Sequence, residues 1–414
     1  MGEPLSFGKK KEVPPRKKRR PMMQYTTFKT LKISKLGFGM MRLPLRADGS
    51  IDEALVCEMV DLALERGVNY FDTAYPYHGG MSEIVTGRVL NRYARDRYML
   101  ASKYPGHQYA DVYDPADVFE TQLKKCGVEY FDFYLLHNVC ESSIDVYEDA
   151  RWGIVDYFLE QRRLGRIRHL GFSSHAEYET LKRFLDRYGS EMEFCQIQLN
   201  YLDWTLQKAK DRYALLTARG IPVWVMEPVR GGRLAKLSAD QVARMEAFAP
   251  GKSAASWAFR WLLGLENVKV VLSGMSDMAQ VRDNIATFSE GKALSKDERG
   301  LLEEIAGELH QMIPCTACRY CCDGCPQGLD IPMLLSSLND VRFSPSFTPA
   351  MRMESLPEDK LPSACIGCGA CAQICPQHID IPALMSEFAG RLADLPSWRK
   401  ICKERAEAAK RLKG

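Results

Sequence analysis

The 414-residue sequence has no apolar run long enough to cross a membrane. Its beginning is basic, but no apolar stretch follows, as a secretory signal would require. Arg19 and Arg20 are followed by Pro21 and then by polar residues, which argues against a twin-arginine export signal. Hydrophobic residues make up 46% and charged residues 26%, which is ordinary for a globular protein. We therefore expect a cytoplasmic protein with no membrane partner.

Positive charge is concentrated in residues 1–24, which hold eight Lys or Arg and two Glu. This segment has a net charge of +6, whereas the whole chain has +3, so the remainder carries about −3. An arm that binds nucleic acid or an acidic partner is one interpretation. The segment shows no aromatic or helical pattern that would support binding, so we favour a disordered, solvated tail and expect no nucleic-acid partner.

Short β-rich runs alternate with segments of helical periodicity from residue 25 to about residue 293. In 51–67, for example, Leu55, Met59 and Leu62 fall on one face of a helix. Eight strands alternating with helices predict a (β/α)8 barrel. A doubly wound sheet is the competing fold, but it usually has a Gly-rich turn after its first strand, which GFGMMR does not match. The expected strands lie at 37–43, 69–74, 98–103, 130–138, 167–174, 194–202, 221–229 and 268–274.

Polar residues stand at the ends of successive predicted strands, where a barrel carries its chemistry. Asp72 ends the second strand, and Tyr77 lies in the loop after it. Lys103 ends the third strand and His137 the fourth. Each alone has a structural explanation, such as a cap, a solvated lysine or a core histidine. Together they can make Tyr77 a general acid. The Lys103 ammonium, held in place by the Asp72 carboxylate, lowers the pKa of the phenol. Such a phenol protonates a carbonyl oxygen while hydride reaches the carbon.

The motifs around these residues make the barrel region similar to the aldo-keto reductases. They are ISKLGFGMMRLP, FDTAYPY, LASK, YLLHN, GFSS and CQIQLN. The resemblance implies that Tyr77, rather than Tyr75, is the proton donor, and that Asp72, Lys103 and His137 are its partners. It also implies NADP(H) or NAD(H) across the barrel mouth. The cofactor-binding positions that it implies are Ser173, Ser174, Gln196, Met226, Gly231, Gly232 and Asn284.

The sequence departs from the family's pattern at two places. NADPH-dependent members usually place Lys or Arg after the last strand to hold the 2′-phosphate, whereas this chain has Gly274 and Gln280 there, with the acidic Asp277 between them. Arg282 or Arg233 would have to substitute. Glu227 stands where a small residue is usual. The alternatives are that it is solvated, that it is paired with Arg230, or that it marks a pocket adapted to another ligand.

Clustered cysteines in a chain without an export signal more often bind metal than form disulfides. Eight of the fourteen cysteines show the spacing C-x2-C-x2-C-x3-C twice, followed each time by Pro. This is the bacterial ferredoxin pattern for 4Fe–4S clusters, in which the fourth cysteine binds the other cluster. Zinc is the alternative, but the doubled match is more specific than paired C-x-x-C motifs. We expect one cluster on Cys315, Cys318, Cys321 and Cys375, and the other on Cys365, Cys368, Cys371 and Cys325.

Cys322 lies beside Cys321 and is the alternative ligand. The remaining cysteines are expected to be small buried hydrophobes; they are Cys57, Cys126, Cys140, Cys195 and Cys402. The chain as a whole resembles aldo-keto reductases with a C-terminal ferredoxin-type domain. We expect a basic disordered tail (1–24), the barrel (25–293), a connecting helix (294–313), a ferredoxin-like, mostly helical domain with two 4Fe–4S clusters (314–390) and a basic C-terminal helix (391–414).

The combination of a nicotinamide-binding barrel with an iron–sulfur domain raises a problem of electron counting. Nicotinamide transfers two electrons as hydride and each cluster one, so FMN at the phosphate loops of the barrel is a further candidate cofactor. We favour an iron–sulfur oxidoreductase that reduces a carbonyl or another unsaturated small molecule, with clusters that relay electrons to or from a soluble electron-transfer protein. The alternatives are a plain NAD(P)H-dependent carbonyl reductase with structural clusters and a non-catalytic electron-transfer subunit. Candidates for the substrate-side wall are Tyr104, His107 and Trp204.

Overall fold

The computed structural model describes residues 23–309, 313, 315, 319–343, 347–375 and 377–413. Nearly all of the predicted basic tail lies outside these residues, as do Cys318 and the last residues of the predicted connecting helix, 310–312. Within the described residues, no helix is long and apolar enough to cross a bilayer.

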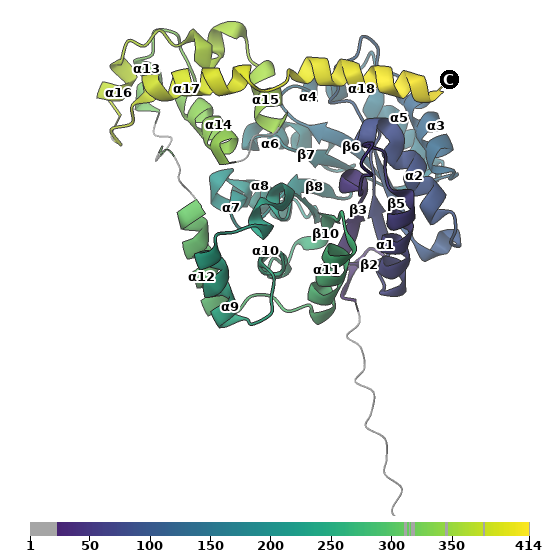
Figure 1. Cartoon of the computed structure of the whole chain (residues 1–414). Helices are drawn as coiled ribbons and strands as arrows, with labels where there is room; N and C mark the ends of the chain where they lie inside the picture. Colours follow the sequence, from purple (N-terminus) through teal and green to yellow (C-terminus); the bar gives the residue numbers. More distant parts are fainter. Residues whose placement is uncertain are drawn as a thin grey trace, which may run out of the picture.

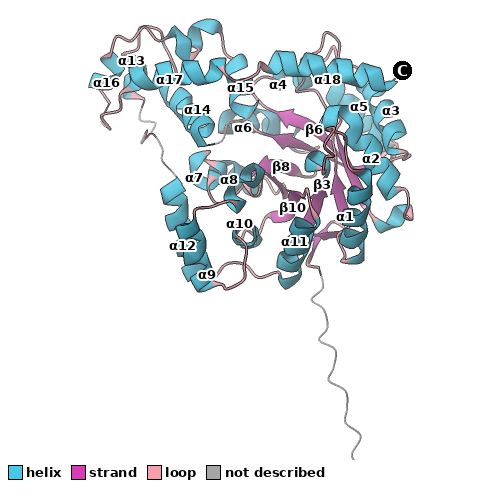
Figure 2. Ribbon diagram, viewed as in Figure 1, coloured by secondary structure: helices cyan, strands magenta, loops and turns pink. Residues whose placement is uncertain are grey.

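Eight parallel strands close into a barrel, which confirms the predicted (β/α)8 fold (Figures 1 and 2). Each strand pairs with the next one along the chain, and the last pairs with the first through Val271 opposite Leu36. Most strand residues are buried, as expected for a sheet covered on both faces. The strands are β3 (Leu36–Gly39), β4 (Tyr70–Asp72), β5 (Met99–Tyr104), β6 (Phe131–Val139), β7 (Ile167–Ser174), β8 (Cys195–Gln198), β9 (Val223–Met226) and β10 (Val268–Gly274).

A hairpin that the sequence analysis did not predict precedes the barrel. It consists of β1 (Tyr25–Phe28) and β2 (Leu31–Ser34), which pair antiparallel. Phe28 and Ile33 join a buried cluster of interior barrel residues, and the Phe28 ring lies 5.1 Å from that of Trp224. The hairpin therefore fills one end of the barrel with apolar side chains.

The helices around the barrel begin and end at residues suited to these positions. Asp52 caps the first of them, since its carboxylate accepts a hydrogen bond from Leu55 N–H. Asp114 caps the third in the same way, and Gly127 ends it with a φ of 62°, where glycine is favoured. The helices are α1 (Glu53–Glu65), α2 (Met81–Leu90), α3 (Pro115–Cys126), α4 (Ile144–Glu148), α5 (Ile154–Arg163), α6 (Tyr178–Tyr188), α7 (Asp203–Leu206), α8 (Ala209–Ala218), α9 (Ala239–Phe248), α10 (Ala254–Leu263), α11 (Met278–Glu290) and α12 (Lys296–Leu309).

A small helical module follows, and it contains the repeated cysteine motifs. Each repeat has a short helix and then a long one: α13 (Tyr320–Asp323) with α14 (Ile331–Phe343), and α16 (Ala370–Gln373) with α17 (Ile381–Ala393). The short helices contact each other, as do the long ones. Their apolar faces enclose a second core, separate from that of the barrel, in which cysteines pack beside Leu, Ile and Met. Between the repeats lies α15 (Phe347–Glu354).

Among the described residues, two ion pairs join this module to the barrel. Arg230 Nη2 lies 3.0 Å from Asp340 Oδ1 on α14, and both side chains are buried. Arg352 on α15 lies 2.9 Å from the carboxylate of Glu177, just before α6. The last helix, α18 (Trp398–Lys413), then returns from the module across the barrel (Figure 1). The module is thus attached to the barrel through α14 and α15.

Gly87 in α2 provides a test of helix packing around the barrel. A Cβ at this position would lie 2.5 Å from the carbonyl oxygen of Cys126 in α3, so the two helices would have to separate. We expect Gly87→Ala to lower the free energy of unfolding by about 1–3 kcal/mol, as measured by urea unfolding followed by tryptophan fluorescence.

Gly300 in α12 is the matched control, because a Cβ there would meet no atom within 4 Å. Gly300→Ala should leave stability unchanged or raise it by up to about 1 kcal/mol through its helix propensity. Equal effects of the two substitutions would show that the contact between α2 and α3 is not as close as described.

Candidate active site and iron–sulfur centre

A fully buried lysine lies at the centre of the barrel mouth. Lys103 Nζ donates hydrogen bonds to Asp72 Oδ1 at 2.5 Å and to the Thr73 carbonyl at 2.7 Å, and it lies 3.5 Å from Tyr77 Oη. Burial works to lower the pKa of Lys103, but Asp72 and Tyr77 together hold it above its ordinary value. The lysine is therefore a permanent cation next to a phenol.

The strand register explains why these groups meet. Asp72 is opposite Ala101 on the neighbouring parallel strand, so Lys103, two residues further on, faces the same side of the sheet. Tyr77 opens the turn η2 (Tyr77–Gly80), in which His78, Gly79 and Gly80 all have positive φ angles. This tight turn directs the Tyr77 side chain back over the strand ends.

Tyr75 in the same loop faces a different lysine. The Nζ atom of Lys125 on α3 lies 4.4 Å from the centre of the Tyr75 ring. The geometry therefore brings Tyr77, and not Tyr75, to Lys103.

His137 lies beside Tyr77 and beside a second histidine, His107. The two ring centres are 5.8 Å apart, and the ring of His107 lies 4.4 Å from that of His137. Burial, His107 and Lys103 hold the pKa of His137 well below its ordinary value. Burial and Arg405 lower that of His107 to about 3. Both histidines are thus uncharged at neutral pH, which avoids further positive charge next to Lys103.

A cleft of about 340 Å³ opens from Asp72 and Tyr77 along the barrel mouth. This volume is in the range of small-molecule sites. The side-chain carbonyl of Gln196 is buried there and has no hydrogen-bond partner among the described residues, so it is available to an N–H group such as a carboxamide. Predicted cofactor positions that line the cleft are Gln196, Met226, Gly231, Gly232 and Asn284.

Ser173 and Ser174, the other two predicted positions, do not belong to this lining. The Ser173 hydroxyl accepts a hydrogen bond from Asn138 N–H, and that of Ser174 donates to the Val139 carbonyl. Both serines are buried and tie β7 to the end of β6. The structure therefore gives these two residues a structural role and adds no support for a cofactor contact.

The acidic residue at the cleft has a different partner from the one proposed from sequence. Glu227 lies 3.5 Å from Arg42, so the proposed pairing with Arg230 is wrong. Arg230 instead turns to Asp340 and to Asp203, at 3.0 and 3.4 Å. The reason is burial: Arg230 is enclosed between barrel and module, where a charge needs a buried carboxylate.

The position at which NADPH-dependent members carry Lys or Arg is occupied by Gln280 in this chain. Gln280 lines the cleft and donates a hydrogen bond to Asp277 at 2.8 Å. Arg282 and Arg233 are exposed and do not belong to the lining. Basic residues in the lining are Arg42 and Lys236.

Two aromatic residues suggested for the substrate-side wall pack elsewhere. Tyr104 is buried, with its ring 5.2 Å from that of Phe158 on α5. Trp204 packs on Trp261 at 5.3 Å. His107, the third candidate, does lie beside His137. An aromatic residue after a strand can face the core as readily as the mouth, and sequence does not distinguish the two.

A comparison with known families decides what kind of barrel this is. The model of the aldo/keto reductase family matches residues 35–306. The chain belongs to the aldo-keto reductases. Its chemistry is therefore that of an NAD(P)H-dependent oxidoreductase.

Individual relatives of this aldo-keto reductase are distant. An uncharacterized oxidoreductase of Bacillus subtilis is 25% identical over 68% of this chain and 95% of its own length. The NADH-specific methylglyoxal reductase of Escherichia coli is 24% identical over 64% of this chain and 91% of its own length. The holo form of an aldo-keto reductase from Bacillus halodurans is 25% identical with a TM-score of 0.56, covering 68% of this chain and 96% of the other.

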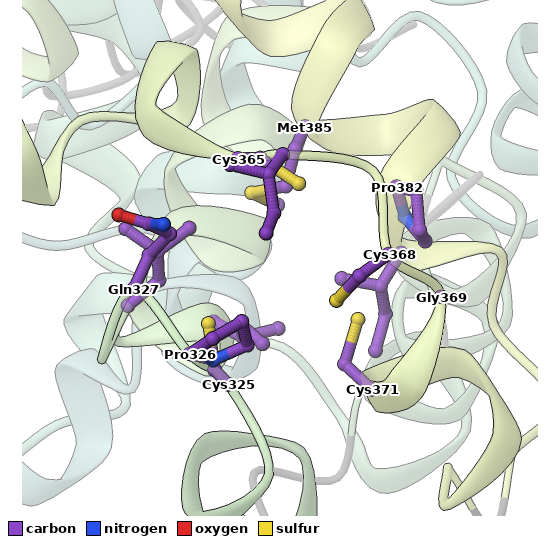
Figure 3. A pocket seen from close by; sticks show the side chains of 13 residues that line it. Cys325, Pro326, Gln327, Cys365, Cys368, Gly369, Cys371, Pro382 and Met385 are labelled. Carbon is purple, nitrogen blue, oxygen red and sulfur yellow. The ribbon is translucent and has the colours of Figure 1, made fainter.

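The helical module matches a second family model, the 4Fe-4S dicluster domain, over residues 314–379. This confirms the predicted iron–sulfur domain. One pocket of the module is lined by four cysteines, Cys325, Cys365, Cys368 and Cys371. Figure 3 shows them around one space, with the thiols of Cys368 and Cys371 toward each other. Because Cys325 comes from the first repeat, this arrangement fits the crossed ligand set of the second cluster.

The other ligand set is described in part. Burial and the neighbouring thiols of Cys322 and Cys315 raise the pKa of Cys321 to about 12, so these three cysteines lie together. Cys318 lies outside the described residues. The crossed position of Cys375 and the choice of Cys321 over Cys322 remain predictions.

Sequence reasoning missed the residues that α18 brings to the barrel mouth. Trp398 is buried, and its ring stacks on that of His107 at 5.7 Å. Arg405 lies above Trp398, with its guanidinium 5.1 Å from the ring centre. Trp398 lies almost 300 residues after His107 in the chain, and no local pattern indicates such a contact.

The ligand set of the second cluster can be tested by removing Cys325. In Cys325→Ser, the thiolate from the first repeat is replaced by a poorer ligand, and the second cluster should be lost. We expect the iron content of anaerobically purified protein to fall from roughly eight to roughly four atoms per chain, with loss of one electron paramagnetic resonance signal after reduction.

Cys322→Ser, a change in the short helix just before Cys325, is the matched control and should retain all the iron. The reverse result, iron loss in Cys322→Ser and none in Cys325→Ser, would overturn the assignment.

Proposed function

We propose that this protein reduces the carbonyl group of a small molecule at the Tyr77 end of the cleft, with Tyr77 as the proton donor. The observation that carries the proposal is the 3.5 Å separation between Tyr77 Oη and the buried Lys103 Nζ, which Asp72 holds in place. NADH or NADPH, when bound in the cleft, supplies the hydride.

Each residue has a distinct part in this reaction. As hydride adds to the carbonyl carbon, the electron pair of the C=O bond moves to oxygen, which takes the proton of Tyr77 Oη. Lys103 stabilises the phenolate that remains, and water returns the proton. Burial raises the pKa of Tyr77, with a smaller contribution from Asp72, and Lys103 opposes this effect. Tyr77 thus stays protonated in the resting enzyme but can release its proton next to the ammonium.

Neutral His137 completes the site. Its Nδ1 atom is buried and has no partner among the described residues. A neutral imidazole can orient the carbonyl oxygen by a hydrogen bond without competing with Tyr77 as an acid. Gln196, with its unpaired carbonyl, would orient the nicotinamide carboxamide, and the positive φ angles of Gly231 and Gly232 shape the loop proposed for the pyrophosphate.

The two clusters, in this proposal, relay electrons between the enzyme and a soluble electron-transfer protein. Cys368 is exposed, and Ile366 next to the same pocket is 62% exposed, so a cluster held there would lie near the surface. Since clusters transfer single electrons, a flavin such as FMN would be needed to exchange them with hydride.

A structural role of the clusters is the second candidate, and one observation favours it. The core of the module is small, and its buried or half-buried members include most of the cluster cysteines. Cluster binding would then supply folding energy, as metals do in other small domains. The presence of Asp72, Tyr77, Lys103 and His137 in one site speaks against the third alternative, a non-catalytic electron-transfer subunit.

Small aldehydes such as methylglyoxal are the first substrates to assay, because one relative is named for that reaction. NADH and NADPH should both be tried. We expect NADH to serve at least as well, since Gln280 and Asp277 occupy the place where NADPH-dependent members have a cation.

The proton donor is tested by Tyr77→Phe. Removal of the hydroxyl leaves the ring contact with His137 but no proton at this position, so kcat for aldehyde reduction should fall roughly 100- to 10,000-fold. The measurement is coenzyme oxidation by the full-length, cluster-loaded protein at saturating aldehyde.

Tyr75→Phe is the matched control, since Tyr75 lies in the same loop but faces Lys125, and its kcat should stay within a few-fold of wild type. If Tyr77→Phe kept most of the wild-type rate on every aldehyde, Tyr77 would not be the acid.

A further inference from the structure

The last helix packs beside the active site. The α18 helix contacts η2, the turn that begins with Tyr77. The Cβ atom of Ala408 lies 3.8 Å from the point where a Cβ of Gly79 would be. Neither family model extends to this helix, since they end at residues 306 and 379. The wall beside Tyr77 is thus made by a segment that the family resemblance does not describe.

The position of α18 is fixed at its start. The carboxylate of Glu354 on α15 accepts hydrogen bonds from the backbone N–H groups of Trp398 and Arg399. Trp398 is 2% exposed and stacks on His107, which contacts His137, which in turn contacts Tyr77. A continuous row of rings therefore connects α18 to the proposed proton donor.

Arg405 lies further along the same helix. It is half-buried, and its guanidinium lies over the Trp398 ring. Its charge acts on three groups of the site: it lowers the pKa values of His107 and His137, and it interacts with the phenol of Tyr77. Arg405 therefore lies close enough to the site for its charge to act there, and its guanidinium lies over the Trp398 ring that stacks on His107.

No carboxylate within the described part of the chain forms an ion pair with Arg405. Three other enclosed arginines have such partners: Arg230 pairs with Asp340, Arg260 with Glu298 and Arg352 with Glu177. The buried Arg212 donates a hydrogen bond to the Ala176 carbonyl instead. Asp72, the carboxylate of the site, is already paired with Lys103. A partly desolvated guanidinium without a carboxylate is costly, and a bidentate anion would satisfy it.

We propose that Arg405 binds a carboxylate of the substrate, so that the preferred substrates are oxo acids: aldehydes or ketones with an anionic group at the far end from the carbonyl. This inference rests on the proposed function for the identity of the carbonyl, but the anion subsite itself requires only binding. The planar guanidinium of Arg405 can bind a planar carboxylate through two hydrogen bonds. The histidines near it are neutral, so they do not compensate its positive charge.

The test compares linear aldehydes of two to six carbons that end in a carboxylate with the corresponding primary amides. Binding to the full-length, cluster-loaded protein is measured by calorimetry, and reduction by coenzyme oxidation. We expect the wild type to bind at least one acid roughly 10- to 100-fold more tightly than its amide. Arg405→Gln should abolish this preference, and Arg405→Lys should keep part of it, since the charge remains but the bidentate geometry does not.

Lys403→Gln, a change at an exposed position of the same helix, is the control and should keep the full preference. No preference in the wild type, or a preference that survives Arg405→Gln in protein with an unchanged thermal transition, would overturn the subsite. Preferential binding of an acid without any NADH- or NADPH-dependent reduction would support the subsite and contradict the proposed function, so the two failures are distinguishable.

Discussion

A lysine ammonium that is fully buried must be neutralised where it lies, and the barrel mouth is built around this requirement. Lys103 is satisfied by Asp72 and by the Thr73 carbonyl, and the register of β4 against β5 brings the three groups together. Burial of the Lys103 ammonium costs free energy, and only a close ion pair with additional hydrogen bonds offsets that cost. Tyr77 lies next to the resulting pair, and the neighbouring histidines stay neutral because they are buried and because Lys103 would repel a further positive charge. The acid–base properties of the site thus follow from one buried ion pair.

The cluster module depends on a comparable constraint. Its core is small, and cysteines fill part of it, so the module has little apolar surface with which to fold alone. Two ion pairs hold it to the barrel, through Asp340 and Arg352, and one of these reaches the residue before the Gly231–Gly232 loop. Helix α18 begins at a cap from α15 and ends over the Tyr77 turn. Loss of the clusters would therefore disturb the wall of the active site as well as the module.

Much of this arrangement was predictable, because it depends on local patterns. Strand periodicity gave the eight barrel strands, and the strand-end positions of Asp72, Lys103 and His137 gave their meeting point. Contacts between distant segments were not predictable. Arg230 pairs with Asp340 of the cluster module, and Glu227 lies beside Arg42 instead. Tyr104 and Trp204 were misplaced because an aromatic residue after a strand carries no sign of the face that it packs on. Trp398 and Arg405 lie beyond both family models, in a helix whose docking only the fold reveals.

The relay of electrons between the nicotinamide cleft and the clusters is tested most directly by an anaerobic titration of the full-length, cluster-loaded protein. NADH and then NADPH are added while the visible absorbance is recorded. If the barrel and the module form one redox unit, the coenzyme bleaches the broad iron–sulfur absorbance, and the spectrum of a bound flavin changes with it. An absorbance that neither coenzyme alters, but that dithionite bleaches, would contradict the relay and leave the clusters with a structural role.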